Sequence, residues 1–234
     1  MEWSDTGIVL GVRRLGEGSG VLEAMTRAHG RHLGLVRGAR SPRNGPVFQP
    51  GNTVALVWRA RLDEHLGAYA VEPLELRAGR LIDDARALAG LNHVCALLRL
   101  APERDPHEAW FAAAMATLDA LETPQAGTAL ARLELLSLAE CGFALDLARC
   151  AVTGARGGLA YVSPRSGRAV GLEAGAAWRE RLLRLPAFLL DAAAEATQAD
   201  VADAFKLTGF FLLRDVYGPR GMAPPEGRRL FAGG

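Results

Sequence analysis

The sequence predicts an α+β multidomain protein, with an N-terminal five-stranded OB-fold barrel at residues 1–78 and an all-α helical domain at residues 79–234. Two observations predict this division. Short apolar segments alternate with Gly, Pro and Asn up to residue 78, and the apolar residues then follow a helical spacing. The chain has 234 residues, half of them hydrophobic, so it can bury the core of one large domain or of two small ones.

Five short strands are expected in the first region, at residues 6–12, 21–26, 31–37, 53–59 and 66–71. Ala28-His29-Gly30 is expected to turn, because its glycine tolerates a positive φ. Residues 38–46 combine Gly, Pro and Asn, which indicates a loop. Short strands at this density favour a small closed barrel, and the five-stranded OB-fold is the most common barrel of this kind.

Helices are expected from about residue 80 onward, where apolar residues return at helical spacing in Leu88, Leu91, Cys95 and Leu98. Asp105-Pro106-His107-Glu108 indicates the start of a second helix, with Asp105 as N-cap and Pro106 in the first turn. Further helices are expected at residues 125–142 and from about Val201 to Gly218. Residues 143–178 are rich in glycine and are expected to be irregular.

The sequence favours a cytoplasmic protein. It has no apolar run of the length that crosses a bilayer, about 18 residues or more. The N-terminus Met1-Glu2-Trp3-Ser4-Asp5 is acidic, whereas a signal peptide begins with basic residues and continues with an apolar stretch. The three cysteines are few and odd in number, as is usual in a reducing compartment.

Positive charge is concentrated near the N-terminus. The segment between Glu23 and Asp63 contains no acidic residue, and acidic residues are frequent after Asp83. The basic side chains of this segment are Arg27, Arg31, Arg37, Arg40, Arg43, Arg59 and Arg61. This asymmetry indicates a module that binds a polyanion, joined to a region of another role; an ordinary solvated surface is the alternative.

No residue pattern indicates catalysis. The five histidines are scattered, and no Ser/His/Asp or Cys/His arrangement is recognisable. Gly16–Gly20 lacks the Gly-Lys-Ser/Thr ending of a phosphate loop and lies between two expected strands, so it is expected to be a hairpin turn. Asp83 and Asp84 are expected at the start of a helix, where their negative charge stabilises the positive end of the helix dipole. We therefore expect no catalytic residue, no enzymatic activity and no cofactor.

Arginines of the barrel are the candidate DNA-binding residues, because guanidinium groups pair with phosphate in a bidentate manner and stack on bases. The candidates are Arg31, Arg37, Arg40, Arg43 and Arg59. Aromatic residues are scarce here, namely Trp3, Phe48, Trp58 and Tyr69, and at least two of them are expected in the core. Contacts to the DNA backbone, tolerant of sequence, are therefore expected to dominate.

Several segments together resemble the RecO family of recombination mediators. Val36–Ser41, and Phe48–Asn52 ahead of a strand with Trp58, resemble the barrel of that family. Leu133–Leu136, leading to Gly142–Ala151, and then Tyr161–Arg168 resemble its helical domain. The similarity covers nearly the whole chain in the same order.

The resemblance implies a DNA-repair function. It implies binding to single- and double-stranded DNA, annealing of complementary strands, and a partnership with RecR at the nucleoid. It also implies contact with the C-terminal tail of the single-stranded-DNA-binding protein and loading of RecA. RecF is a candidate partner whose participation the sequence leaves open. Two alternatives stay open: a nucleic-acid-modifying enzyme that uses the barrel to capture its substrate, and a structural adaptor without DNA contact.

One departure from the family concerns metal binding. Many members carry two Cys-x-x-Cys pairs in the helical domain, and the matching positions here are Cys150, Thr153, Gly171 and Ala174. A structural zinc ion needs four soft or imidazole ligands, and a single thiol cannot hold it. We therefore expect residues 143–178 to form a degenerate, metal-free zinc-finger-like segment, with no metal in the protein.

The resemblance also points to a partner-binding helix. In the family, a basic residue near the start of the helix expected at 125–142 is implicated in binding the acidic tail, and Arg132 matches it. This helix has more leucines than one buried face requires, and Leu136 is expected to contribute to the apolar groove. The alternative for Arg132 is an ion pair within the protein, for instance with Asp119.

Overall fold

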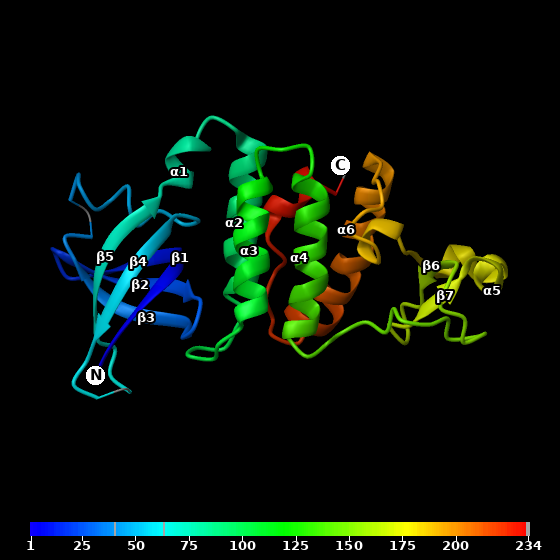
Figure 1. Cartoon of the computed structure of the whole chain (residues 1–234), viewed down its shortest axis with the longest axis horizontal. Helices are drawn as coiled ribbons and strands as arrows, with labels where there is room; N and C mark the ends of the chain where they lie inside the picture. Colours follow the sequence, from blue (N-terminus) through cyan, green and yellow to red (C-terminus); the bar gives the residue numbers. More distant parts are fainter. Residues whose placement is uncertain (40, 63, 233–234) are drawn as a thin grey trace. The chain divides into compact units, whose positions relative to one another are not determined.

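The computed structural model describes residues 1–39, 41–62 and 64–232, which form two compact units, Met1–Glu122 and Thr123–Gly234. The predicted fold class is confirmed, because a five-stranded barrel is followed by a mainly helical region (Figure 1). The first unit contains three helices in addition to the barrel. None of the helices in the described ranges has the length and apolar character needed to cross a bilayer.

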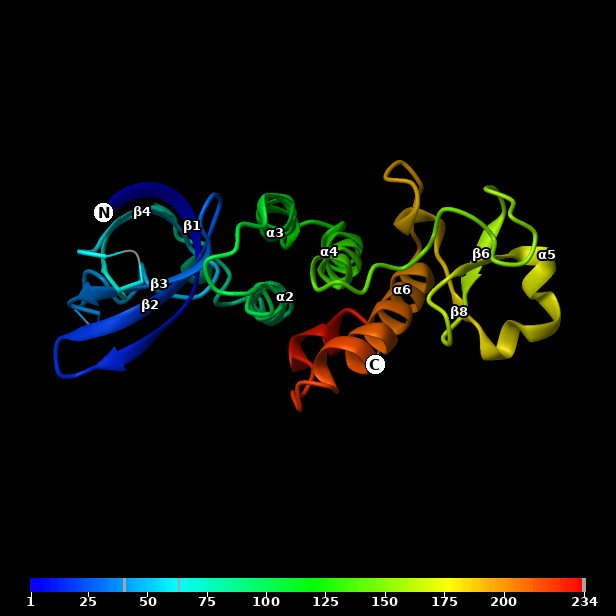
Figure 2. The ribbon, with the colours of Figure 1, turned by 90° about the horizontal axis from the view of Figure 1, so that it is seen from below.

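The barrel consists of β1 (Glu2–Leu15), β2 (Ser19–Thr26), β3 (Gly30–Arg37), β4 (Thr53–Arg59) and β5 (Ala68–Glu75). The strands pair in the order β1-β2-β3-β5-β4, and pairing of β1 with β4 closes the ring, whose curvature is visible in Figure 2. All neighbours are antiparallel except β3 and β5, which meet in parallel at the single pair Leu35 and Ala68. The five predicted strands are confirmed, although β1 extends further at both ends, and β5 begins at Ala68 and ends at Glu75, where the sequence predicts residues 66–71.

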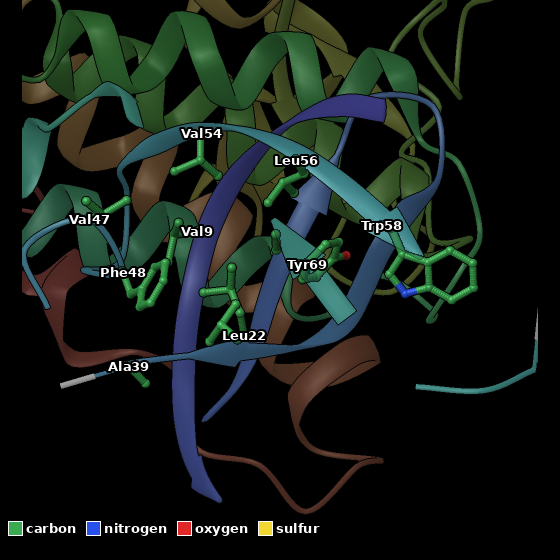
Figure 3. Packing of buried hydrophobic residues seen from close by; sticks show 11 residues of the cluster. Val9, Leu22, Ala39, Val47, Phe48, Val54, Leu56, Trp58 and Tyr69 are labelled. Atoms are coloured by element: carbon green, nitrogen blue, oxygen red, sulfur yellow. The ribbon is translucent and has the colours of Figure 1, made fainter. Parts of the chain in front are cut away.

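The barrel interior is filled by eleven buried residues from all five strands and the loop before β4, nine of which are labelled in Figure 3. Trp58 is fully buried, and its indole N–H donates to the carbonyl of Leu66 at 3.0 Å. Phe48 and Tyr69 are also buried, and Trp3 packs against the cluster while half-buried. Three of the four aromatic residues of this region therefore belong to the core, which confirms that few remain for stacking on bases.

Three helices follow the barrel in the first unit: α1 (Arg77–Arg80), α2 (Ala85–Leu98) and α3 (Glu108–Ala120). Asp84 caps α2 by accepting hydrogen bonds from the backbone N–H groups of Arg86 and Ala87. Cys95 is buried on this helix, and burial raises the pKa of its thiol to about 12.

The predicted start of α3 is wrong by two residues, because its N-cap is His107 and not Asp105. The cause is a contact with the barrel. The N–H of Arg104 donates to the carbonyl of Arg31 at 2.8 Å. A Cβ added at Gly30 would lie 2.1 Å from the carbonyl oxygen of Asp105. The backbone before α3 therefore lies against β3, and this tertiary contact overrides the local capping signal.

The second unit is built on two long helices, α4 (Ala126–Glu140) and α6 (Gln198–Phe211), the latter prolonged by a π-helical turn at Leu212–Tyr217. Both helices agree with the prediction. They face each other around a buried polar group, where the carboxylate of Glu134 accepts hydrogen bonds from Thr208 on α6 and from Arg228. Glu134 is fully buried, and the Arg228 guanidinium pairs with it at 2.9 Å.

The expectation of an all-α second region needs one correction. In the sequence between α4 and α6, the chain forms a three-stranded sheet of order β7-β6-β8, with β6 (Leu159–Val162), β7 (Ala169–Gly171) and β8 (Leu183–Arg184). The short helix α5 (Leu172–Gly175) and the 3-10 turns η1 (Ala176–Arg181) and η2 (Ala187–Leu189) accompany it. We call residues 143–184 the finger segment. Its strands span two to four residues, too few to show an alternating pattern in the sequence.

Candidate nucleic-acid interface

Two arginines meet at one end of the barrel because of the strand register. Arg14, near the end of β1, lies opposite Gly20 on β2. Arg37, at the end of β3, lies opposite Ser19, the neighbour of Gly20. The side chains therefore come from strands on either side of β2 and reach the same rim.

Two hollows open along this rim and share Ser19. One, of about 480 Å³, is lined by Arg14, Ala39 and the β1–β2 hairpin. The other, of about 410 Å³, is lined by Arg37 and Asn44, with the edges of Phe48 and Tyr69. We call this pair of hollows the rim groove. Its lining is both polar and apolar, and each hollow contains one arginine. Such a surface suits a single strand of nucleic acid, which offers phosphates and the faces of its bases.

Arg14 and Arg37, which line the rim groove, and Arg13 and Arg43 in the adjoining segments have uncompensated charge. Arg37 and Arg43 are exposed, and no acidic partner is found for them in the part of the chain that the structure describes. The same holds for Arg13 and Arg14. The one acidic residue that lines the groove is Glu17, in the hairpin. The local potential is therefore positive, as binding of a phosphate backbone requires.

The loop after β3 is held in a defined conformation. Gly38 adopts a φ of 61°, and the Asn44 side chain donates to the carbonyl of Arg37 at 3.2 Å. The Asn52 side-chain amide donates to the carbonyls of Pro46 and Val47 at 2.8 and 3.1 Å. These bonds present Arg43 from a fixed backbone, so less conformational entropy is lost when it meets a ligand.

Two of the predicted DNA-binding residues are paired with acids of the protein. The Arg31 guanidinium lies 2.7 Å from Glu23, and its Nε–H donates to the carbonyl of Ala101 at 2.8 Å. Arg59 lies 2.8 Å from Glu2, its cross-strand neighbour on β1; this hydrogen bond raises the pKa of Arg59 and lowers that of Glu2. The acid-free segment is thus partly neutralised by acids that precede it or border it.

The predicted set therefore divides into three groups. Arg37 lines the rim groove and Arg43 lies exposed on the loop after β3, while Arg31 and Arg59 are engaged elsewhere. Arg40 lies outside the described residues. Sequence reasoning missed Arg13 and Arg14. Two consecutive arginines directly before the Gly16 turn were the available signal, because residues next to a hairpin turn lie at the end of a sheet.

The predicted partner residues lie on α4. Arg132 donates to the carbonyls of Phe188, Asp191 and Ala192 at 2.9 to 3.4 Å, and its guanidinium lies 5.5 Å from the centre of the Phe188 ring. It therefore binds the carbonyl end of η2, and no acidic residue of the described chain pairs with it, so the alternative of an ion pair is not seen. Leu136 is half-buried, whereas Leu130, Leu133 and Leu138 are buried.

The positions that match the family's zinc ligands do not fit a metal ion. Cys150 is 2% exposed, and its Sγ accepts a hydrogen bond from the N–H of Gly171 at 3.2 Å. Hydrogen bonds from the Thr153 side chain, and from backbone N–H groups of Gly171, Thr153 and Val152, lower the pKa of this thiol to about 6. Donors around a sulfur replace the cation that would otherwise stabilise it. No group of three metal-binding side chains occurs in residues 1–39, 41–62 and 64–232.

The closed barrel of order β1-β2-β3-β5-β4, followed by helices, defines an OB-fold protein of the α+β class. The family description "Recombination protein O N terminal" matches residues 1–77, and "Recombination protein O C terminal" matches residues 82–222. The chain belongs to the RecO family. The two matches meet between residues 77 and 82, whereas the compact units meet between residues 122 and 123.

Curated relatives are similar over nearly their whole length. The chain is 59% identical to "DNA repair protein RecO" of Chelativorans sp. (strain BNC1), over 99% of this chain and 94% of that protein. It is 58% identical to the protein of the same name from Methylocella silvestris, with the same coverage. The protein of the same name from Methylobacterium nodulans is also 58% identical, over 99% and 96%.

Proposed function

We propose that the chain is a recombination mediator in DNA repair. It binds single- and double-stranded DNA, anneals complementary strands and, with RecR, helps to load RecA onto DNA coated by the single-stranded-DNA-binding protein. Membership of the RecO family supports this role, and so do its relatives' names. The observation that carries the DNA-binding part is the rim groove, where Arg14 and Arg37 face polar and apolar lining without an acidic partner.

We propose binding without enzymatic activity. The rim groove contains no cysteine or histidine in its lining, and its one carboxylate, Glu17, lies in an exposed hairpin. A hydrolytic site would need a nucleophile with its base, or a cluster of metal ligands. If incubation with single-stranded or duplex DNA yields a cleaved or modified strand that disappears in groove variants, the proposal of a nucleic-acid-modifying enzyme replaces this one.

The test is a salt titration of binding to a labelled oligonucleotide. Each phosphate contact on a single strand contributes about 0.7 to the slope of log K against log salt, so contacts by Arg14, Arg37 and Arg43 give about −2. Further contacts by Arg31 and Arg40 would make the slope steeper, at about −3 or beyond. The triple variant Arg14→Ala, Arg37→Ala, Arg43→Ala should have a slope that is shallower than that of the wild type by about 2, and it should anneal slowly.

The matched control is Arg59→Ala, which removes an arginine that already pairs with Glu2 at 2.8 Å. This variant should keep the slope of the wild type within about 0.3, less than half of one phosphate contact. If the triple variant retains the wild-type slope, DNA does not lie in the rim groove. If Arg59→Ala lowers the slope as much as a groove variant, the division between paired and unpaired arginines has no functional meaning.

We propose further that α4 contributes to the site for the acidic tail of the single-stranded-DNA-binding protein, with Arg132 and Leu136 as contact residues. Half-buried Leu136 and the Arg132 guanidinium offer an apolar and a cationic group to a peptide that ends in an apolar side chain and a carboxylate. Such a peptide would compete with the carbonyls of Phe188, Asp191 and Ala192 for Arg132.

Arg132→Glu should abolish binding of a fluorescent tail peptide while DNA binding changes little. Arg132→Ala separates charge reversal from the loss of the carbonyl contacts, and circular dichroism checks that both variants fold. If the folded variants bind the peptide as the wild type does, Arg132 serves only to hold η2, and the tail binds elsewhere. A parallel loss of peptide and DNA binding would also contradict the proposal.

A further inference from the structure

We propose that the finger segment carries a second surface for single-stranded DNA, centred on Trp178 and separate from the rim groove. The inference rests on the proposed function only in that the ligand is DNA. Its residues all belong to the second unit, and none of them takes part in the barrel.

The first observation is charge. Residues 143–184 contain seven arginines and three acidic residues, whereas the remainder of the second unit has six basic and eight acidic residues. All seven arginines are exposed. They are Arg149, Arg156, Arg165, Arg168, Arg179, Arg181 and Arg184. Positive charge is therefore concentrated on this small part of an otherwise acidic unit, which is the electrostatic pattern of a polyanion site.

The second observation is that most of this charge is uncompensated. Arg168 pairs with Asp146 at 3.2 Å, and Arg184 approaches Asp203 at 3.9 Å. Among the described residues, no acidic partner is found for the other five arginines. Surface arginines that serve solubility are commonly interspersed with acids. Five open guanidinium groups on one small segment instead favour a ligand that supplies the negative charge.

The third observation is an exposed tryptophan. Trp178, on the 3-10 turn η1, is 57% exposed, whereas Trp58 and Trp110 are fully buried. The finger segment does not need its indole for packing, because its core consists of Cys150, Tyr161 and Val170. The segment of the chain just before Trp178 is anchored instead by Gly175, where an added Cβ would lie 2.6 Å from the Tyr161 ring.

Arginine and indole lie together in this turn. The Arg181 guanidinium lies 5.7 Å from the centre of the Trp178 ring, and Arg184 lies at the same distance from the ring of Tyr161. Cation–π contacts of this kind hold a flat side chain in place and put positive charge beside it. An aromatic face with arginines around it is the arrangement that binds single strands, where the indole stacks on a base and guanidinium groups bind phosphates.

An unpaired strand fits this surface better than a duplex or a protein. In a duplex the bases are stacked on one another and cannot cover an indole, so a duplex would use the arginines and leave Trp178 exposed. A protein partner would favour an apolar surface with few charges at its centre, and here arginines surround the aromatic residue. The occupant we assign is therefore a segment of single-stranded DNA.

The experiment compares two oligonucleotides of equal length and charge, oligo(dT) and its abasic counterpart, with the full-length protein. Trp178→Ala should weaken binding of oligo(dT) by about tenfold, the effect of losing one base stack, and should leave the abasic strand unaffected. Arg179→Ala with Arg181→Ala should weaken both strands. Leu172→Ala is the matched control, because Leu172 is 56% exposed on the same segment without being aromatic; it should bind both strands as the wild type does.

Tryptophan fluorescence gives a second readout. Stacking on oligo(dT) should quench the emission of the wild type, and the quenching should be largely lost in Trp178→Phe, because the other tryptophans are buried or packed against the core. Equal affinity of Trp178→Ala and wild type for oligo(dT) would overturn the proposal. So would competition by polyglutamate that matches competition by DNA, since the surface would then bind an acidic protein.

These experiments distinguish failure of the Trp178 surface from failure of the rim groove as a DNA-binding site. If the rim-groove variant loses its salt slope and Trp178→Ala behaves as the wild type, the barrel binds DNA and the finger segment does not. If Trp178→Ala loses affinity for oligo(dT) and the rim-groove variant does not, the second surface stands and the groove assignment fails.

Discussion

The barrel and the finger segment both present arginines at the surface, but they are held together by different means. Eleven buried residues fill the barrel, whose five strands form a closed ring. Three buried residues form the core of the finger segment, and one of them is a thiol that accepts hydrogen bonds. The barrel is therefore held mainly by apolar burial, whereas the finger segment combines a much smaller apolar core with hydrogen bonds to the sulfur of Cys150.

The largest effect on stability is expected from a substitution in the core of the barrel. Replacing Trp58 by Ala removes a fully buried side chain and its bond to Leu66, and should lower the free energy of unfolding of the first unit by about 3–5 kcal/mol in urea denaturation. Trp178→Ala is the control, because substitution of an exposed residue should change the free energy of unfolding by less than about 0.5 kcal/mol. Equal effects of the two substitutions would mean that burial does not explain the stability of the barrel.

A smaller effect is expected at the thiol. Cys150→Ala leaves the N–H of Gly171 without its acceptor, which should cost about 1–3 kcal/mol. Because the finger segment has so small a core, the loss should appear as faster cleavage within residues 143–184 in limited proteolysis, with the barrel unchanged. Cys141→Ala, at a half-buried cysteine outside the finger segment, should leave this cleavage rate near that of the wild type.

The finger segment should also respond to pH in one direction. Hydrogen bonds lower the pKa of the Cys150 thiol from about 9 to about 6 in the folded protein, so the folded state favours the thiolate. This stabilisation is complete above pH 9 and declines as the pH falls toward 6. Proteolysis of the segment should therefore accelerate between pH 8 and pH 6.5 in the wild type, beyond any change seen in Cys150→Ala. An identical pH profile in the two proteins would contradict a thiolate role.

The smallest expected effect is that of metal removal. Three of the four family ligand positions are Thr153, Gly171 and Ala174, so neither region should depend on zinc. Dialysis against a chelator should leave the Tm and DNA binding unchanged, and elemental analysis of protein purified without chelator should find far less than one zinc per chain. A drop in Tm that added zinc restores would place a metal site where the sequence excludes one.

The sequence predicts those parts of the fold that depend on local patterns. A short run rich in apolar residues marks β4 at the predicted residues 53–59, and helical spacing marks α4 and α6. It fails where tertiary contacts decide. The shift from Asp105 to His107 at the start of α3 follows from packing against Gly30, which no local signal shows.

The candidate site was predictable only in part for the same reason. The arginine-rich segment is visible in the sequence, but pairing of Arg59 with Glu2 depends on the register of β1 and β4, which brings together residues 57 positions apart. Arg14 joins Arg37 through the register of β2. The exposure of Trp178 could not be inferred either, since an isolated tryptophan in a glycine-rich stretch has no pattern that distinguishes core from surface.

The barrel is closed most weakly between β3 and β5, and this determines where it should open locally. β3 and β5 share one residue pair, Leu35 and Ala68, whereas every other pair of neighbouring strands shares seven or more. Because local opening starts where the fewest backbone hydrogen bonds must break, this seam should open first, and amide hydrogens at the start of β5 should exchange with solvent ahead of those in β2. Leu35, Ala68 and Tyr69 line the second hollow of the rim groove, so opening of β3 from β5 should also widen the groove beside Arg37.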